Sequence, residues 1–433
     1  MPVTRIVMEG SPVVNSQRLL ERFLRYVKID TTANDASTAA PSSPGQLELG
    51  RLLVEELQAL GIRDACQDPY GVVLATVPAT VAAAETIAFC AHLDTSPETS
   101  GSGVKPQVIR DYAGGDLVLP GDRSRVIRHG ECPELEQMLG RTIITSDGTT
   151  LLGADDKAGL AVIMETVAWL MEHPESRRGA IRLCFTCDEE IGRGVDHLDL
   201  DRVGAAVCYT LDGPGADTID VETFSADLAL VTIRGVNIHP SIARGRMTNA
   251  VRVAAHFIQA LPRDALAPEA TAGREGFLHP YELHGGVAEI QLKILLRDFQ
   301  DALLAEHADQ LRQLAAATMA GFPAATIDVA IRPQYRNMAA GLAREPRAVS
   351  YAQHALARLG RQAQLASIRG GTDGSRLTAL GLPTPNLSTG EHTPHSPLEW
   401  TCLEEMVQAC QGLVSLAEVV KTVSSIHSAE LGG

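Results

Sequence analysis

Hydrophobic and polar positions along the first half of the chain alternate in blocks typical of helices and of buried strands. Residues 15–29 and 46–60 space their apolar positions as amphipathic helices do. Continuous apolar runs at 71–77 and 86–94 are short enough to be buried strands. The alternation continues with a helix over 157–173 and strands over 180–186 and 205–212. We therefore expect an α/β fold with a mixed, mostly parallel sheet flanked by helices.

A different pattern begins at about residue 222. Residues 227–235 alternate between apolar and polar positions, as a half-buried strand does. Two helices are then expected at 249–261 and 300–320, with further strands at 281–286, 288–299 and 325–331. The resulting order, β-α-β-β-α-β, predicts a small α+β sandwich of the ferredoxin-like type.

Helix and short-strand alternation returns at about residue 335. We therefore expect residues 222–334 to form a second domain, inserted into a main domain made of 1–221 and 335–433. Within the main domain, residues 95–122 are rich in Gly, Pro and Asp and are expected to be a long loop.

Composition and charge argue against several classes of protein, namely those that bind nucleic acid, bind anionic membranes, span a membrane or are secreted. The 433 residues carry 37 Lys and Arg against 53 Asp and Glu, and this net charge of −16 argues against nucleic acid or an anionic membrane as a partner. No apolar run reaches the ~20 residues of a membrane span, and residues 1–14 lack the features of a secretory signal. We therefore expect a cytoplasmic protein. Cysteines are sparse, so Cys184 and Cys187 are interpreted as reduced core thiols.

Potential metal ligands follow several of the expected strands, where sites in open α/β sheets gather. His92 and Asp94 stand two residues apart, so their side chains would share one side of a strand. His92 could bind a metal while Asp94 orients the imidazole. The alternative is a strand-end histidine followed by a turn aspartate.

Acidic pairs occupy two further positions. Asp155 and Asp156 stand directly before a helix, where aspartate is also a common N-cap. Asp188, Glu189 and Glu190 follow the strand at 180–186, and a solvated acidic turn is the plain alternative. In a metal site, one of the two glutamates could bind the ion while its neighbour acts as a base on water.

Two more positions complete the set. Asp212 ends another apolar run, and His392 and His395 lie in a Pro-rich loop; a turn aspartate and surface histidines are the alternatives. Carboxylates mixed with imidazoles suit zinc, with cobalt or manganese as substitutes. The carboxylates are too many for one tetrahedral ion and suit two ions that share a bridging carboxylate.

Long segments resemble one family across nearly the whole chain, from about residue 16 to the C-terminal helix. They include AHLDTSPETSGSGVKPQVI, TSDGTTLLGADDKAG, FTCDEEIGRG, HPSIARGRMTNA and RGGTDGSRL. In these segments the chain resembles the peptidase T family of aminotripeptidases, in the di-zinc metallopeptidase superfamily of aminoacylases and carboxypeptidases. The resemblance implies a zinc-exopeptidase-like main domain and a lid or dimerisation domain.

Matched motif by motif, the resemblance implies a role for each candidate. Asp94 would be the orienting, catalytically essential partner of a histidine ligand, and Glu189 the general base. Asp155 would be the carboxylate shared by two zinc ions, whereas Asp156 receives no role. The remaining ligands would be His92 and Asp212 at the first zinc, and Glu190 and His395 at the second.

The inserted domain would supply substrate contacts. The resemblance implies that His239, Asn249 and Arg297 reach the substrate, with Arg369 as a weaker candidate for its carboxylate. The chain departs from the family pattern at Ser396-Pro397, where Gly-Lys usually follows the last metal histidine. His392 stands three residues before His395 and is the alternative ligand. A second departure is Ser241, which follows Pro240 at a position where the family commonly has glycine.

The resemblance implies a di-zinc aminopeptidase with two Zn²⁺ per subunit. It would remove the N-terminal residue of short peptides, most of all tripeptides, by metal-activated water with Glu189 as base. Pairing through the inserted domain would make a homodimer. A related di-zinc dipeptidase, carboxypeptidase or N-acyl amino acid hydrolase is the alternative. A non-catalytic peptide-binding protein is a remote alternative. Such a protein would be expected to have lost metal ligands or Glu189, and all of these residues are present here.

Overall fold

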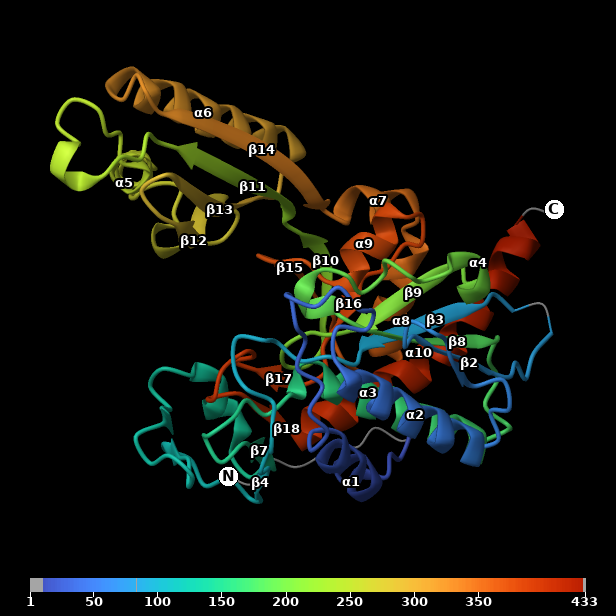
Figure 1. The fold of residues 1–433 in the computed structure, drawn as a ribbon. Coiled ribbons are helices and arrows are strands. Elements are labelled where there is room, and N and C mark those ends of the chain that lie inside the picture. Colours follow the sequence, from blue (N-terminus) through green and yellow to red (C-terminus); the bar gives the residue numbers. More distant parts are fainter. Residues whose placement is uncertain (1–10, 83, 431–433) are drawn as a thin grey trace. The chain divides into compact units, whose positions relative to one another are not determined.

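The computed structural model describes residues 11–82 and 84–430, with side chains up to 420. Contacts divide the chain into two compact units. Unit 1 contains residues up to 221, 341–366 and 372 onwards, and unit 2 contains 222–340 and 367–371 (Figure 1). The chain therefore enters unit 2 at Glu222, returns to unit 1 at Gly341, and later contributes one further short segment, 367–371, to unit 2. Residues 1–10, for which the sequence predicts no role, lie outside the described part.

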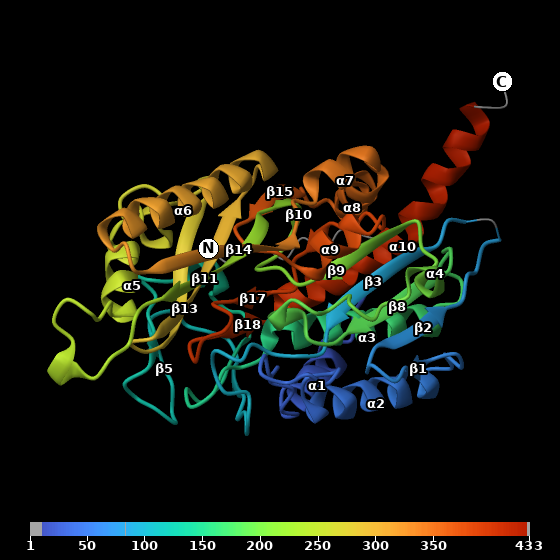
Figure 2. The ribbon, with the colours of Figure 1, turned by 45° about the horizontal axis from the view of Figure 1, so that its top comes forward.

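The main sheet of unit 1 has eight strands in the order β1-β2-β8-β3-β9-β16-β10-β15. Its four central strands run parallel: β8 (Ile181–Thr186), β3 (Ile87–His92), β9 (Val207–Leu211) and β16 (Asn386–Leu387). Antiparallel neighbours extend the sheet on both sides, namely β1 (Cys66–Gln67), β2 (Val73–Val77) and β10 (Thr218–Thr223), and β15 (Gln364–Ile368) completes it. Every residue of β3 and β9 is buried, as expected for strands covered on both faces. The predicted mixed α/β fold is confirmed (Figure 2).

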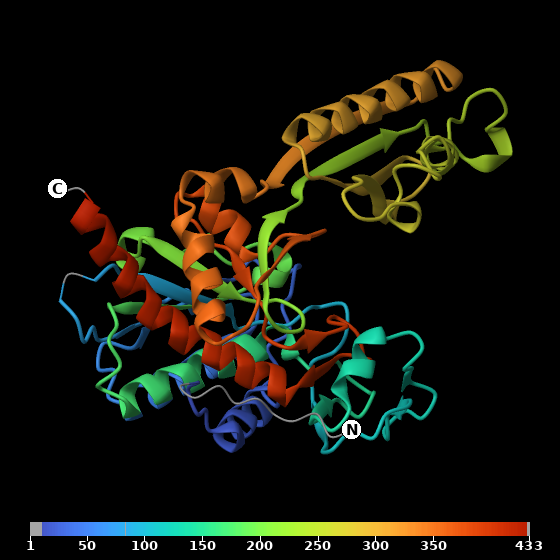
Figure 3. The ribbon, with the colours of Figure 1, turned by 180° about the vertical axis from the view of Figure 1, so that it is seen from behind.

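Helices cover both faces of this sheet. α3 (Ala154–Glu172) packs on β3 and β9, and α10 (Leu403–Glu430) packs against α3 and α8 (Arg347–Arg358). Seen from behind in Figure 3, α10 runs across this unit. The remaining helices are α1 (Ser16–Tyr26), α2 (Pro44–Ala59), α4 (Leu200–Val203), α7 (Ala339–Arg344) and α9 (Asp373–Ala379). No helix in the described part of the chain is long and apolar enough to cross a membrane.

A smaller sheet occupies part of the region expected to be a loop. β4 (Gln107–Ile109), β7 (Ile143–Thr145), β18 (Trp400–Cys402) and β17 (Glu391–His392) form an antiparallel sheet beside the main one. β5 (Leu117–Val118) pairs with β6 (Val126–Ile127), and the 3-10 helix η1 (Pro133–Met138) follows. The expectation of a loop throughout 95–122 is therefore wrong. Strands of two or three residues are too short to show a period, and β4 in addition pairs with β7 more than 30 residues later.

Unit 2 is an antiparallel sheet with two helices. Its strands are β11 (Ser225–Arg234), β12 (Phe277–Gly285), β13 (Glu289–Asp298) and β14 (Thr326–Tyr335), and its helices are α5 (Ala250–Gln259) and α6 (Asp301–Gly321), with 3-10 turns η3 (Pro240–Ile242) and η4 (Pro268–Ala270). The strand order is β12-β13-β11-β14. Along β13, buried residues alternate with more exposed ones, and the buried set packs on α5 and α6. The predicted β-α-β-β-α-β order is present. β12 begins at 277 rather than 281, and β14 continues to 335 rather than 331.

Candidate metal centre

The centre begins at the carboxyl end of β3, where His92 is the last residue. The His92 side chain is 3% exposed, and its Nδ1 lies 3.1 Å from the backbone oxygen of Asp94 and 3.4 Å from Asp94 Oδ1. When Nδ1 carries the proton for these acceptors, the lone pair of Nε2 faces the other way. Nε2 lies 2.9 Å from Asp155 Oδ1 and 4.0 Å from Asp212 Oδ1. His92 is therefore oriented as a metal ligand would be.

Asp94 also fixes the turn that carries the two glutamates. Its Oδ1 accepts a hydrogen bond from the backbone N–H of Glu189, and its Oδ2 from that of Glu190, both at 3.0 Å. These residues open the 3-10 turn η2 (Glu189–Ile191), and a carboxylate at the start of such a turn satisfies its free N–H groups. One aspartate thus positions both the imidazole of His92 and the Glu189–Glu190 backbone.

Asp155 lies between two imidazoles. Its Oδ1 is 2.9 Å from His92 Nε2, and its Oδ2 is 3.1 Å from His395 Nε2. The backbone of the preceding segment is held by Glu399, whose carboxylate accepts hydrogen bonds from the N–H groups of Leu152 and Gly153 at 2.7 Å and of Asp155 at 3.1 Å. Each oxygen of Asp155 therefore faces a different side, as a bridging carboxylate requires.

Glu190 and His395 meet on the second side of Asp155. Glu190 Oε2 lies 2.9 Å from His395 Nε2, and the Glu190 side chain is 5% exposed. His395 has a φ of 60°, a left-handed conformation that is uncommon for a residue with a side chain. Thr99 Oγ1 donates to the backbone oxygen of His395 at 2.7 Å and helps to hold this conformation.

Three carboxylates gather on the first side. Asp212 follows β9, and Asn386 holds its backbone on both sides: Asn386 Oδ1 accepts from its N–H at 3.2 Å, and Asn386 Nδ2 donates to its oxygen at 2.6 Å. One side-chain oxygen each of Asp155, Asp212 and Glu391 lies within 4.8 Å of the other two. Asp156 is also buried, but its oxygens accept from the backbone N–H groups of His92 and Gly159.

The centre contains several buried carboxylates that lie close to one another, and their negative charges favour bound cations. Burial and then the Asp155 carboxylate raise the pKa of Glu190 to about 7. Burial likewise raises the pKa of Asp212 well above its usual range, and Asp155 and Glu391 add to that effect. Among the described residues, Glu190 Oε1 is buried without a hydrogen-bond partner. Buried carboxylates are stable when they are paired or bind metal, so the donor set fits two divalent cations.

The remaining acid of the triplet, Asp188, is not a solvated turn residue. It is 3% exposed, and its carboxylate accepts hydrogen bonds from Ser42 N at 2.7 Å, from Ser42 Oγ and from Gln46 Nε2 at 2.6 Å. Its own N–H donates to Gln46 Oε1 at 3.0 Å. The solvated-turn reading of Asp188 is therefore wrong, because the residue fastens the turn after β8 to the start of α2.

The structure also separates the two histidines of the Pro-rich loop. His392 Nε2 lies 2.8 Å from Glu405 Oε2, and its ring stacks on Trp400 at 3.7 Å between centroids. His392 is thus held in the core of the smaller sheet, whereas His395 faces the carboxylates. Glu391 and Glu399, in the same stretch of chain, were not predicted from the sequence, because a single acid that belongs to no ligand motif is typical of a turn or a surface.

The four expected substrate contacts belong to unit 2. His239 Nδ1 accepts a hydrogen bond from Ser241 N at 3.3 Å and lies 2.7 Å from Ser241 Oγ. Asn249 is the N-cap of α5, with its side chain accepting from Val251 N at 2.9 Å. The Arg297 guanidinium lies over the ring of Tyr335, 5.0 Å from its centroid.

Arg369 is tied to a loop of its own unit. Its Nη1 donates to the backbone oxygens of Gly273 at 3.0 Å and Glu275 at 2.9 Å, and its Nη2 to Thr271 Oγ1 at 3.0 Å. The guanidinium also lies over the ring of Phe224. These contacts give Arg369 a positioning role in the loop at 271–275.

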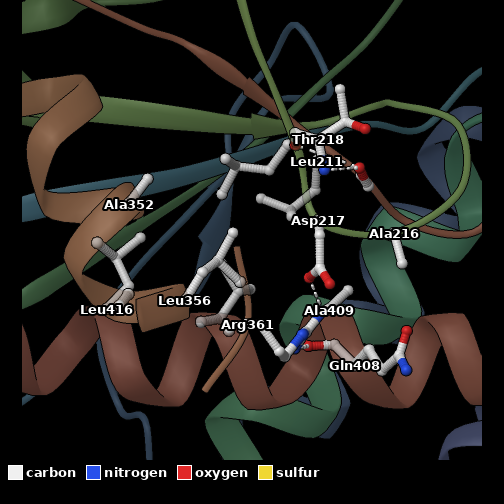
Figure 4. A pocket seen from close by; sticks show the side chains of 15 residues that line it. Leu211, Ala216, Asp217, Thr218, Ala352, Leu356, Arg361, Gln408, Ala409 and Leu416 are labelled. Atoms are coloured by element: carbon white, nitrogen blue, oxygen red, sulfur yellow. Dashed lines mark hydrogen bonds and ion pairs between the residues drawn. The ribbon is translucent and has the colours of Figure 1, made fainter. Parts of the chain in front are cut away.

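A separate pocket in unit 1, with none of the proposed metal ligands in its lining, lies between β9, α8 and α10 (Figure 4). Its lining is mostly apolar, including Leu211, Leu356 and Leu416, and the Arg361–Asp217 ion pair lies among these side chains. The space inside is about 40 Å³, which holds a water molecule but no peptide. The pocket is therefore no candidate for the substrate site.

Comparisons with known proteins agree with this arrangement. The model of Peptidase family M20/M25/M40 matches residues 148–419. Peptidase T of Geobacillus thermodenitrificans is 42% identical over 410 residues, which is 94% of this chain and all of that protein. Peptidase T of Clostridium botulinum is 40% identical and covers 93% of this chain and 98% of its own length.

Solved structures show the same fold. Aminopeptidase PepT from Bacillus cereus is 25% identical, with a TM-score of 0.71 over 94% of this chain and 99% of its own. A tripeptidase from Staphylococcus aureus, 23% identical, has a TM-score of 0.74 over 95% of this chain and all of its own. The YXEP protein of Bacillus subtilis, described as a dinuclear metal-binding peptidase of family M20, is 17% identical with a TM-score of 0.61 and covers 94% of this chain and 98% of its own. From the family model and the close peptidase T relatives, the chain belongs to peptidase family M20/M25/M40 and is a peptidase.

Proposed function

We propose that this peptidase is a two-metal aminopeptidase that removes the N-terminal residue from short peptides, tripeptides above all. The observation that carries the proposal is the placement of Asp155 between His92 and His395, at 2.9 and 3.1 Å, with one oxygen toward each imidazole. Two cations sharing this carboxylate account for it. The names of the peptidase T relatives and of the Bacillus cereus aminopeptidase support the choice of substrate.

We assign the metal ligands as two sets that share Asp155. His92 and Asp212 would complete one set, and Glu190 and His395 the other. Imidazole with carboxylate donors suits Zn²⁺, and Co²⁺ or Mn²⁺ could replace it. When bound, such ions polarise a carbonyl oxygen and lower the pKa of water to about 7.

Glu189 is the proposed general base. It shares a turn with Glu190, and Asp94 fixes the N–H groups of both residues. A carboxylate held beside the metal ligands, but not one of them, can take a proton from water and pass it to the leaving amine. Asp94 acts as a positioning residue for this turn and for His92.

We further propose that unit 2 contacts the peptide. His239 Nδ1 accepts from Ser241 N, which leaves the proton on Nε2. An Nε2–H group could donate to the oxyanion that forms at the scissile carbonyl, and one such donor typically contributes about 3–4 kcal/mol. Asn249 and Arg297 would bind the peptide backbone and its carboxylate, with Arg369 as the weaker candidate.

A peptide panel tests the proposal. The purified protein, stripped with a chelator and reloaded with Zn²⁺, is assayed against di-, tri- and tetrapeptides that are free, N-acetylated or C-amidated. We expect fastest release of the first residue from free tripeptides, no release from acetylated ones, and loss of activity on chelation that Zn²⁺ restores. Faster cleavage of acetylated peptides would instead indicate an N-acyl hydrolase, and release of the last residue a carboxypeptidase. Preference for dipeptides would indicate a dipeptidase, and binding without turnover a peptide-binding protein.

A further inference from the structure

Glu391 lies at the metal centre without a role in the proposed reaction. It opens β17, where it pairs with Thr401 of β18. Its backbone also forms a bridge with Pro214, two residues after Asp212, and its oxygen accepts from Gly215 N at 3.4 Å. The backbone of Glu391 is thus fastened to the loop that follows Asp212, so the position of its side chain relative to that ligand is defined.

The side chain of Glu391 points into the carboxylate cluster. The residue is 4% exposed, and a side-chain oxygen lies within 4.8 Å of oxygens of both Asp155 and Asp212. It accepts a long hydrogen bond from Thr389 Oγ1, at 3.5 Å. A hydrogen bond of this length, from a neutral hydroxyl, does little to balance a buried negative charge.

The Glu391 carboxylate lies on the Asp212 side of the metal centre. Glu391 groups with Asp155 and Asp212 and is not grouped with Glu190, whereas His92 groups both with Asp156 and Asp212 and with Asp155 and Glu190. On the Asp212 side, His92 is the neighbouring imidazole, 4.0 Å from Asp212 Oδ1. Asp155 faces His92 and His395, so the two imidazoles do not balance the further charges of Asp212 and Glu391, but a divalent cation among the three carboxylates can.

We propose that Glu391 is an additional ligand of the metal ion held by His92, Asp155 and Asp212. The inference rests on the two-metal site of the proposed function. Catalytic zinc usually has three protein ligands and an open position. A fourth ligand makes the Asp212 side richer in oxygen, with three carboxylates and one imidazole, and ions that accept more than four oxygen-type ligands, such as Mn²⁺, bind well to such sets. The two metal positions therefore differ, and the Asp212 side suits Mn²⁺ better than the Glu190 side does.

The test compares wild type with Glu391→Gln, which keeps the shape and removes the charge. Glu131→Gln, at an exposed position 71% accessible, is the charge-matched control. Each protein is stripped with a chelator and titrated calorimetrically with Mn²⁺ alone and with Zn²⁺ alone. We expect wild type and Glu131→Gln to bind two Mn²⁺. In Glu391→Gln, one of the two should bind at least about tenfold more weakly, with a smaller change for Zn²⁺.

The absorption spectrum of the Co²⁺-loaded proteins gives a second readout that does not depend on activity. Removal of a ligand lowers the coordination number of one ion, so the visible bands of Glu391→Gln should be more intense than those of wild type. Glu391→Asp, which keeps the charge on a shorter chain, should fall between the two and covers the case in which the glutamine variant does not fold. Unchanged Mn²⁺ affinity and an unchanged spectrum in both variants would overturn the assignment of Glu391 and leave the proposed function standing. Wild type that binds fewer than two ions would overturn both.

Discussion

Single residues at the centre divide into acids that face the metal positions and acids that hold the backbone. Glu190 belongs to the first kind, since its Oε1 is buried without a hydrogen-bond partner in the described part of the chain. Asp188 and Glu399 belong to the second, because each accepts three hydrogen bonds. In the sequence these acids look alike, and only their surroundings assign them to different tasks.

The role of Glu189 can be tested by one isosteric change. Glu189→Gln removes the proton acceptor but keeps the turn, because Asp94 binds the backbone N–H of this residue rather than its side chain. We expect kcat for tripeptides to fall by about 10²–10⁴-fold, with both metal ions retained on elemental analysis. Activity within about tenfold of wild type, at full metal content, would show that another group takes the proton.

A pH-dependent effect on stability is expected at Asp220, which is not one of the proposed metal ligands. Burial raises the pKa of Asp220 to about 6, although a hydrogen bond from Asn386 Nδ2 at 2.9 Å opposes this. The folded protein therefore holds this proton more tightly than the unfolded chain, whose pKa is 3.8. The bound proton of Asp220 contributes to the free energy of unfolding. This contribution is fully present below pH 3.8 and is lost as the pH rises through about 6.

Asp220→Asn stays neutral at every pH and should relieve this loss. We expect its free energy of unfolding, from urea denaturation of the metal-free protein, to exceed that of wild type by about 1–3 kcal/mol at pH 8. The two proteins should converge at pH 4. Asp309→Asn, whose side chain is 67% exposed, is the control and should show no pH-dependent difference. A difference of equal size at pH 4 and pH 8 would contradict the titration of Asp220.

At the scale of elements, the turn after β8 depends on α2. Asp188 has a φ of 64° and connects the last residues of β8 with Ser42 and Gln46 at the start of α2. Removing its carboxylate takes the acceptor away from three donor groups, namely Ser42 N, Ser42 Oγ and Gln46 Nε2. We expect Asp188→Ala to lower the free energy of unfolding by about 2–4 kcal/mol. Asp188→Asn, which keeps one acceptor oxygen, should lose less.

The measurement is urea denaturation of both Asp188 variants beside Asp196→Ala, a change at a more exposed acid of the same unit. Metal titration of the folded variants adds a second readout, because η2 carries Glu190. A loss below about 1 kcal/mol in Asp188→Ala would mean that water replaces the missing acceptor and that the turn does not depend on α2.

Elements with a strong local signal could be predicted from the sequence, and elements made by distant pairing could not. The helix expected at 157–173 is α3, Ala154–Glu172, and the strand expected at 86–94 is β3, Ile87–His92. β4, by contrast, has three residues and pairs with β7 more than 30 residues later. A strand this short has no measurable period, so its existence depends on the segment that it meets.

The same limit holds for the centre. His92 and Asp155 could be proposed from sequence because they stand in long segments that resemble a known family, whereas His395 stands where the chain departs from the family pattern and had His392 as its alternative. Glu391 and Glu399 could not, because their function arises from the folding of the loop after β16 onto residues more than 150 positions earlier. The sequence therefore predicted a set of candidate ligands that the structure brings together, but not all of the acids that surround them.

At the scale of the whole molecule, all of the proposed metal ligands come from unit 1, although they span residues 92–395 of the sequence. The insertion of unit 2 between Asp212 and His395 leaves this set intact, because the chain leaves the main sheet at β10 and rejoins it at β15. Unit 2 has its own buried core, formed by its sheet and the two helices α5 and α6. The metal centre and the inserted unit can therefore be altered separately by mutation.

A substitution in unit 2 alone can test the expected homodimer. β12 is an edge strand of its sheet, and its Leu283 is 45% exposed. An exposed edge strand with apolar side chains is a ready site for pairing with a second copy, and a lysine there disfavours such pairing. We expect sedimentation velocity to show a dimer for wild type at micromolar concentration and a monomer for Leu283→Lys. Leu139→Lys, at a 61% exposed position of unit 1, should stay dimeric. A wild-type monomer would contradict the dimer itself, whereas a dimer that persists in Leu283→Lys would place the interface away from β12.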